Sequence, residues 1–137
     1  MRLTRDVGDI LDRFSISILK DARISTRTTH KEFKQYERGF EDLLLEFAND
    51  HTTLNNTLRR LTDLNTIIWD LESAVRQGQL DDDVEEVGRR AIAIRQTNAL
   101  RIATCNEVNI YFQEGTENVK KYHVSASAGS KDSPDQT

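Results

Sequence analysis

The residues best suited to hold a ligand surround the only tryptophan of the chain, Trp69, which is followed by Asp70 and Glu72. Because helix residues two positions apart point to different sides, these two carboxylates cannot act as a pair. Glu72 lies close to the apolar stripe and is a candidate anchor for a cationic ligand or a metal. We favour the simpler interpretation, in which Trp69 belongs to the core and Asp70 pairs with Arg89 or Arg90.

Two asparagines, Asn65 and Asn98, occupy positions where a helix stripe calls for apolar residues. Asparagine in a helix seam fixes register and partner choice at some cost in stability, and we favour that role. The alternative is ligand binding, because Arg101 lies one turn after Asn98 and the two can bind an anion by charge-assisted hydrogen bonds. In that alternative Lys20, Asn98 and Arg101 converge on a pocket closed by Trp69.

Motifs for metal, nucleotide or covalent chemistry do not emerge from the sequence. The three histidines are scattered, with no second ligand at the spacing of a zinc site. Cys105 falls on an apolar stripe and is typical of a buried small hydrophobe rather than a nucleophile. There is no glycine-rich phosphate loop. We therefore predict no catalytic residue, no metal and no cofactor.

Composition points to a thin helical protein with few classes of partner. Of the 137 residues, 31% are charged and 36% are hydrophobic, and the single proline is Pro134. This balance suits helices that each offer one apolar stripe and a wide polar face. The net charge of −4 and the pI near 5.4 argue against binding to nucleic acid or to an anionic membrane. The lone cysteine and the absence of a long apolar run indicate a cytoplasmic location.

The first element that must position these residues is a helix predicted from Arg5 to Ile24, with Thr4 as its N-cap. It carries one strong apolar face and a weaker one formed by Ile16 and Leu19. Two apolar faces indicate a helix that lies in a groove between two others or under a dimer partner.

A second apolar stripe begins after Thr29, which forms a capping-box pattern with Glu32, and continues to about Gln77. One helix of that length would extend for roughly 70 Å, against about 35 to 40 Å for a compact domain of this size. We therefore expect a break in the weak helix-forming stretch Asn49–Thr53.

Gly78 predicts the sharpest turn, after which Asp82 and Glu85 cap a further helix that ends at Glu114–Gly115. The two helices around Gly78 should run antiparallel. The last helix is predicted to turn an apolar stripe inward, made of Val84, Val87, Ala91, Ile94, Ile102, Cys105 and Phe112.

A turn near Gly78 also predicts which residues lie opposite each other in the hairpin. Asp70 should approach Arg89, and Leu61 should approach Asn98. The fold class is all-α, either an antiparallel helical hairpin or a three-to-four-helix bundle. The helical domain is expected over residues 1–124, and the polar, Ser- and Gly-rich residues 125–137 should form a disordered tail.

Three blocks carry a resemblance to a known family: VGDILDRFSISILK from Val7, WDLE from Trp69, and a last block with Asn98, Arg101 and Asn109. In order and spacing they resemble a family of short all-helical proteins from bacteria and their phages, known as a domain of unknown function. The resemblance implies an all-α hairpin fold and no particular activity. Its pattern positions are Asp12, Lys20, Asn65, Trp69, Asp70, Glu72, Asn98, Arg101 and Asn109.

The chain departs from that family pattern at Ser73, Ala99 and Asn118, where acidic residues are expected. These departures weaken any carboxylate-built metal or acid–base site. The function expected is therefore a non-enzymatic helical interaction or assembly module of bacterial or phage type, which docks a protein partner or a second copy as a homodimer. The alternative is a small-ligand protein or enzyme acting on an anionic metabolite, a sugar phosphate or nucleotide. Candidate ligand-binding residues are Asp12, Lys20, Trp69, Glu72, Asn98 and Arg101.

Overall fold

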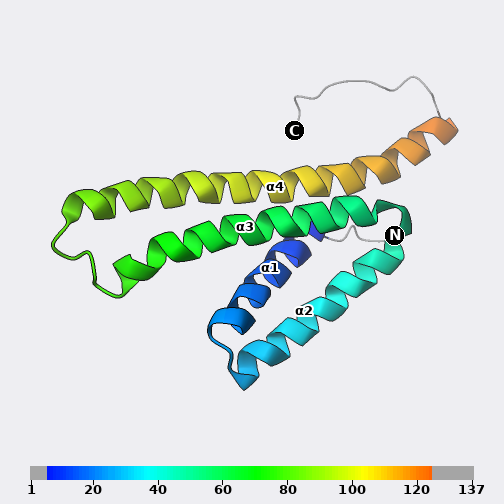
Figure 1. Cartoon of the computed structure of the whole chain (residues 1–137). Helices are drawn as coiled ribbons and strands as arrows, with labels where there is room; N and C mark the ends of the chain where they lie inside the picture. Colours follow the sequence, from blue (N-terminus) through cyan, green and yellow to red (C-terminus); the bar gives the residue numbers. More distant parts are fainter. Residues whose placement is uncertain (1–5, 125–137) are drawn as a thin grey trace.

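Two helical hairpins make up the fold, and they pack against each other at an angle (Figure 1). The first joins α1 (Val7–Arg23) to α2 (Arg27–Glu46). The second joins α3 (His51–Arg76) to α4 (Val84–Val124), which lie side by side and antiparallel. The predicted antiparallel hairpin is therefore confirmed, and it is one half of a four-helix packed domain.

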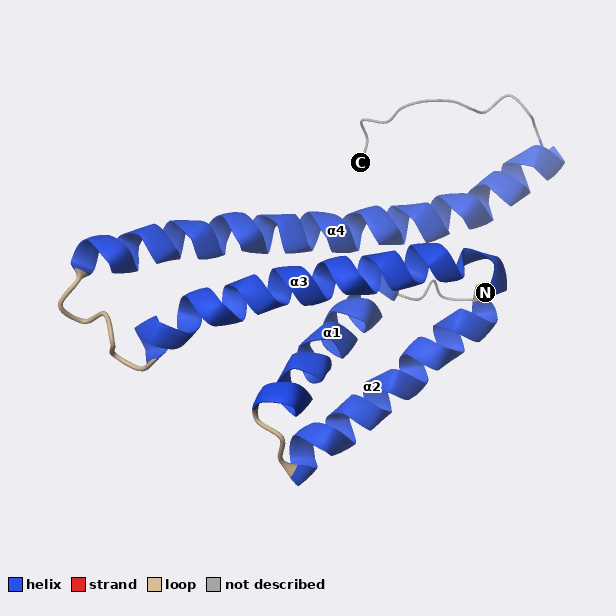
Figure 2. Ribbon diagram, in the orientation of Figure 1, coloured by secondary structure: helices blue, strands red, loops and turns tan. Residues whose placement is uncertain are grey.

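The computed structural model describes the backbone of residues 6–124 and the side chains of residues 6–113. Every regular element within that range is helical, as Figure 2 shows, so the predicted all-α class is confirmed. None of the described helices combines the length and the hydropathy that a membrane crossing requires. The predicted disordered tail, residues 125–137, lies outside the described residues.

The start of α1 differs from the prediction by two residues. Its N-cap is Asp6, whose carboxylate accepts the backbone N–H of Asp9 at 2.9 Å. The aspartate accepts a hydrogen bond from one of the unpaired N–H groups of the first turn, and its negative charge interacts favourably with the positive end of the helix dipole. The predicted cap, Thr4, is therefore wrong, and it precedes the described residues.

The capping box of α2 also lies earlier in the chain than predicted. Thr26 is the N-cap, and its hydroxyl accepts the N–H of Thr29 at 3.1 Å. In return the Thr29 hydroxyl accepts the N–H of Thr26 at 2.8 Å, the reciprocal arrangement that satisfies two unpaired donors. Thr29 is the third helical residue rather than the cap, and Glu32 is left free to contact Lys20.

The predicted interruptions after α2 and α3 are confirmed, with one difference in capping. A short 3₁₀ turn, η1 (Ala48–Asp50), separates α2 from α3. Gly78 has a φ of +76°, the left-handed conformation that favours glycine. The cap of α4 is Asp83 instead of Asp82, since the Asp83 carboxylate accepts the N–H of Glu86 at 3.0 Å.

The last helix is longer than predicted. Instead of ending at Glu114–Gly115, α4 continues to Val124. A single glycine inside a helix costs only about 1 kcal/mol relative to alanine, so Gly115 by itself does not end α4.

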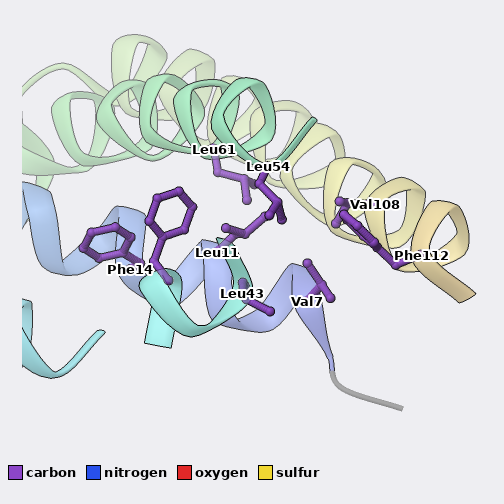
Figure 3. Packing of buried hydrophobic residues seen from close by; sticks show 9 residues of the cluster. Val7, Leu11, Phe14, Leu43, Leu54, Leu61, Val108 and Phe112 are labelled. Carbon is purple, nitrogen blue, oxygen red and sulfur yellow. The ribbon is translucent and has the colours of Figure 1, made fainter. Parts of the chain in front are cut away.

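The hydrophobic core lies where the two hairpins meet (Figure 3). α1 packs against α2, α3 and α4, so the predicted groove between helices is confirmed for this helix with two apolar faces. Its neighbour α4 comes so close that a Cβ added to Gly8 would lie 2.7 Å from the Cys105 carbonyl oxygen. The buried cluster consists of Val7, Leu11, Phe14, Phe40, Leu43, Leu54, Leu61, Val108 and Phe112.

The face that α4 turns inward differs in part from the predicted stripe. Phe112 is buried as expected, but Val84 and Ile102 are 79% and 49% exposed. Thr104 and Val108 are buried in their place. The predicted stripe runs from Val84 to Phe112, almost eight helical turns. Its spacings do not average 3.6 residues, so successive members rotate around the helix and the two ends do not lie on one face.

The register of the α3–α4 hairpin is displaced from the predicted one. Leu61 was expected opposite Asn98, yet its neighbour Arg60 donates to the Thr104 hydroxyl at 3.0 Å. Nearer the turn, Arg90 donates to the Leu71 carbonyl oxygen at 3.3 Å. α3 ends at Arg76 and α4 begins at Val84, so the midpoint of the connection lies after Gly78. Each residue of α3 therefore faces a residue of α4 that is further along the chain than predicted.

The hairpin has two regions that differ in burial. In the first, which we call the base (residues 51–65 and 104–113), α3 and α4 contribute buried side chains to the core. In the second, the arm (residues 66–103), none of the described side chains is buried. Figure 1 shows the arm extending past the shorter hairpin of α1 and α2.

Candidate functional site

A network of polar side chains joins three helices at the boundary between base and arm. Its centre is Asp12 of α1, which is 9% exposed. One carboxylate oxygen accepts the Asn65 amide at 3.0 Å, and the other accepts the Arg101 guanidinium at 2.6 Å. Asn65 also donates to the Ser15 hydroxyl at 2.8 Å. The network therefore connects α1 to α3 and to α4, and we call it the Asp12 clamp.

The Asp12 clamp extends along α4 through Asn98. Its side-chain oxygen accepts from Arg101 Nε at 3.0 Å and from Nη2 at 2.8 Å. These bonds hold the guanidinium plane so that Nη1 reaches Asp12. Each bond to a charged group is worth more than a neutral one, and a low-dielectric site increases the cost of leaving any member unpaired.

A solvent-open hollow of about 280 Å³ lies beside the Asp12 clamp. Four of the six candidate ligand residues come together here: Trp69, Glu72, Asn98 and Arg101 line it, and Asp12 is bonded to Arg101 just behind its wall. Its volume is just below the range of about 300 to 1,000 Å³ that is usual for small-ligand sites. Its full lining is Ile16, Leu19, Asn65, Ile68, Trp69, Glu72, Asn98 and Arg101.

Lys20 is the candidate that the structure places elsewhere. Its ammonium lies 4.0 Å from the Glu32 carboxylate of α2, and it lines a second hollow together with Arg13 and Tyr36. The predicted convergence of Lys20 with Asn98 and Arg101 is therefore not found. The reason is helical geometry, since Lys20 lies on the side of α1 that faces α2, whereas Asp12 faces α3 and α4.

The surroundings of Trp69 differ from the core position that the sequence favoured. The indole is half-buried at the wall of the hollow, with the Arg23 guanidinium 5.7 Å from the ring centroid. The Asp70 carboxylate pairs with the same Arg23 at 2.6 Å and not with Arg89 or Arg90 as predicted; Arg90 reaches Asp70 only at its backbone carbonyl oxygen, at 3.4 Å. Arg90 instead bonds Glu86, and the Arg90 and Arg89 guanidinium groups hold the pKa of the Glu86 carboxyl below its usual value.

The charges around the hollow are largely compensated by neighbours within the chain. Arg101 is paired with Asp12, and Glu72 is paired with Arg76 at 3.1 Å. Among the described residues, no group of three or more histidine, cysteine or acidic side chains is placed to hold a metal ion. Burial, with a smaller contribution from Asp12, raises the pKa of the nearby Cys105 thiol to about 11. A thiol with that pKa stays protonated near neutrality and is a poor nucleophile.

Sequence patterns identified some members of the Asp12 clamp and missed others. Asn65 and Asn98 were recognised because they interrupt apolar stripes, and both belong to the site. Ser15 was missed, although it also interrupts the apolar stripe of α1 and is fully buried. The ion pair between Asp12 and Arg101 joins residues 89 positions apart, and no local pattern reports a contact of that range.

Comparisons of the chain with family models, with curated proteins and with solved structures found no match.

Proposed function

We propose that the protein is a non-enzymatic helical interaction module that works by associating with itself through the α3–α4 hairpin. The observation that carries this proposal is the distribution of exposed apolar side chains. Of the eight large hydrophobic residues exposed among the described ones, six belong to the hairpin or its link. They are Ile67, Val84, Ile92, Leu100, Ile102 and Tyr111. The concentration of exposed apolar side chains on one hairpin supports an interaction surface there.

The internal pairing of the Asp12 clamp supports the same proposal. Asp12 and Arg101 satisfy each other, and Asn65 uses its amide to bridge α1 and α3. A seam asparagine bonded across helices is the best-attested device for fixing one register among several. A fixed register holds the arm in one position relative to the base and gives the outer face of the hairpin a single shape.

Light scattering over a dilution series tests the proposed self-association. The expected result is a mass that rises above 15.7 kDa as the protein concentration increases from micromolar to millimolar. Leu45→Lys is a matched control, because Leu45 is an exposed apolar residue of α2, outside the hairpin. This variant should associate like the wild type. A mass of 15.7 kDa at every concentration would contradict self-association.

The alternative function, a protein or enzyme for an anionic metabolite such as a sugar phosphate or nucleotide, is favoured by one feature, the hollow beside Trp69. Arg101 and the Asn98 amide line it, but an anion would have to compete with Asp12 for the guanidinium. Since Trp69 is the only tryptophan, its fluorescence reports on the hollow. Saturable quenching by glucose 6-phosphate or AMP that Asn98→Ala weakens would support this alternative. An unchanged spectrum would exclude it.

A further inference from the structure

The outward side of α4 carries a stripe of isoleucine, alanine and amide side chains that faces no described helix. The inward side uses Thr104, Val108 and Phe112, and Figure 2 shows α4 at the edge of the domain with α3 on one side only. Opposite these residues, side chains recur at alternating spacings of four and three, which is the pattern of a coiled-coil seam. This outer stripe consists of Ile92, Gln96, Ala99, Ala103, Asn106 and Ile110. All are exposed except Ile110, which is half-buried.

The outer stripe reads the same in both directions. Positions equally distant from Arg101 carry matching residues: alanine at 99 and 103, a side-chain amide at 96 and 106, and isoleucine at 92 and 110. In a two-fold symmetric pair, residue i meets residue j and j meets i. Two copies of this stripe therefore place matching residues opposite each other when the second helix runs antiparallel and the two-fold axis passes beside Arg101.

The centre of the stripe suits such an axis. The Arg101 side chain points inward to Asp12, so no charge lies at the middle of the outer surface. Ala99 and Ala103 are small and allow two backbones to come close. Leu100 and Ile102, each 49% exposed, border the alanines on either side and would each meet their own counterparts across the axis.

We propose that a second copy of this chain packs antiparallel along the outer stripe of α4, with the two-fold axis beside Arg101. This proposal rests on the proposed self-association and specifies its geometry. The stripe is about 27 Å long, and a helix is about 10 to 12 Å wide, which gives a contact footprint of roughly 300 Å². Standard interfaces bury about 800 Å² per partner, so the dimer is reversible, with a dissociation constant on the order of micromolar or weaker.

Disulfide trapping in a Cys105→Ala background tests where the axis lies. Leu100→Cys should link readily to itself, because its counterpart lies across the axis. Ile92→Cys and Ile110→Cys should each fail to self-link but should link to each other when the two variants are mixed. Self-linking of Ile92→Cys would indicate a parallel pair and overturn the proposed geometry. Self-association without any of these links would overturn the proposed surface while leaving the module function intact.

Introducing charged residues at the two alanine positions provides the second test. Ala99→Glu with Ala103→Glu, and Ala99→Lys with Ala103→Lys, place like charges on each homodimer and should each give a monomer at concentrations where the wild type associates. Mixing the two variants should restore a dimer. Circular dichroism checks that each variant remains folded, which we expect because both positions are exposed helix sites. Dimers of either variant alone would overturn the proposed surface, and so would a mixture that stays monomeric.

Discussion

The base and the arm of the α3–α4 hairpin belong to the same two helices but are held by different means. In the base, Leu54 and Leu61 are fully buried beneath α1 and its neighbours. In the arm, α1 adds ion pairs such as Arg23 with Asp70 and Asp12 with Arg101, but the described side chains there stay half-buried or exposed. The difference shows that length alone does not stabilise a helical hairpin. Stability comes from a third and fourth helix, and the surface left without them is available for association.

The largest expected effect is on the free energy of unfolding, when one substitution in the base is compared with one in the arm of the same helix, α3. Leu61→Ala removes a fully buried side chain and should lower the free energy of unfolding by about 3 kcal/mol through lost burial and a cavity. Ile67→Ala, on the exposed side of the same helix, should cost less than about 0.5 kcal/mol. Urea unfolding followed by circular dichroism measures both. Equal losses would show that the arm carries as much of the stability as the base.

The next effect concerns the Asp12 clamp at the boundary. Asp12→Ala leaves Arg101, whose side chain is a quarter exposed, bonded to Asn98 but without its carboxylate partner, and should cost about 2 kcal/mol. In a double-mutant cycle, Arg101→Ala should cost little more once Asp12 is gone. The matched pair in the arm, Glu86 with Arg90, should show a smaller coupling, because its two residues are neighbours on one helix and the Glu86 side chain is 28% exposed, against 12% for Asp12. A coupling between Asp12 and Arg101 near zero would mean that the clamp does not join the helices energetically.

The smallest effect is the reactivity of Cys105 in the base. With a pKa of about 11, its thiolate fraction at pH 8 should be about 100-fold below that of a thiol with a pKa of 9. Iodoacetamide should therefore react slowly with the folded protein and readily with Ala99→Cys in a Cys105→Ala background. Because the folded pKa is raised, this thiol adds stability below about pH 9 that is lost as the pH rises through 11. Equal alkylation rates would contradict the burial of Cys105.

How far the sequence predicted these features depended on the range of the interactions involved. The break before His51 and the turn at Gly78 depend on local conformational preferences, and both were predicted within a few residues. The caps at Asp6 and Thr26 were missed because several Asp and Thr residues stand next to each helix start, and only tertiary packing selects among them.

The candidate site was predicted in part for the same reason. Polar residues inside apolar stripes identified Asn65 and Asn98, since stripe membership is a local property. The separation of Lys20 from Arg101 depends on the rotation of α1 between its neighbours, which follows from packing and not from the spacing along one helix. Ile102 was assigned to the wrong side of α4 because the position of the inward face depends on where α1 and α3 touch it.

Amide hydrogen exchange measured at several protein concentrations tests the central claim most directly. The account predicts that the base exchanges slowly and at the same rate in dilute and concentrated samples, since its protection comes from its own core. Residues 92–103 of the arm should exchange faster in dilute solution and become protected as the concentration rises. Arm protection that equals that of the base and does not depend on concentration would contradict the account.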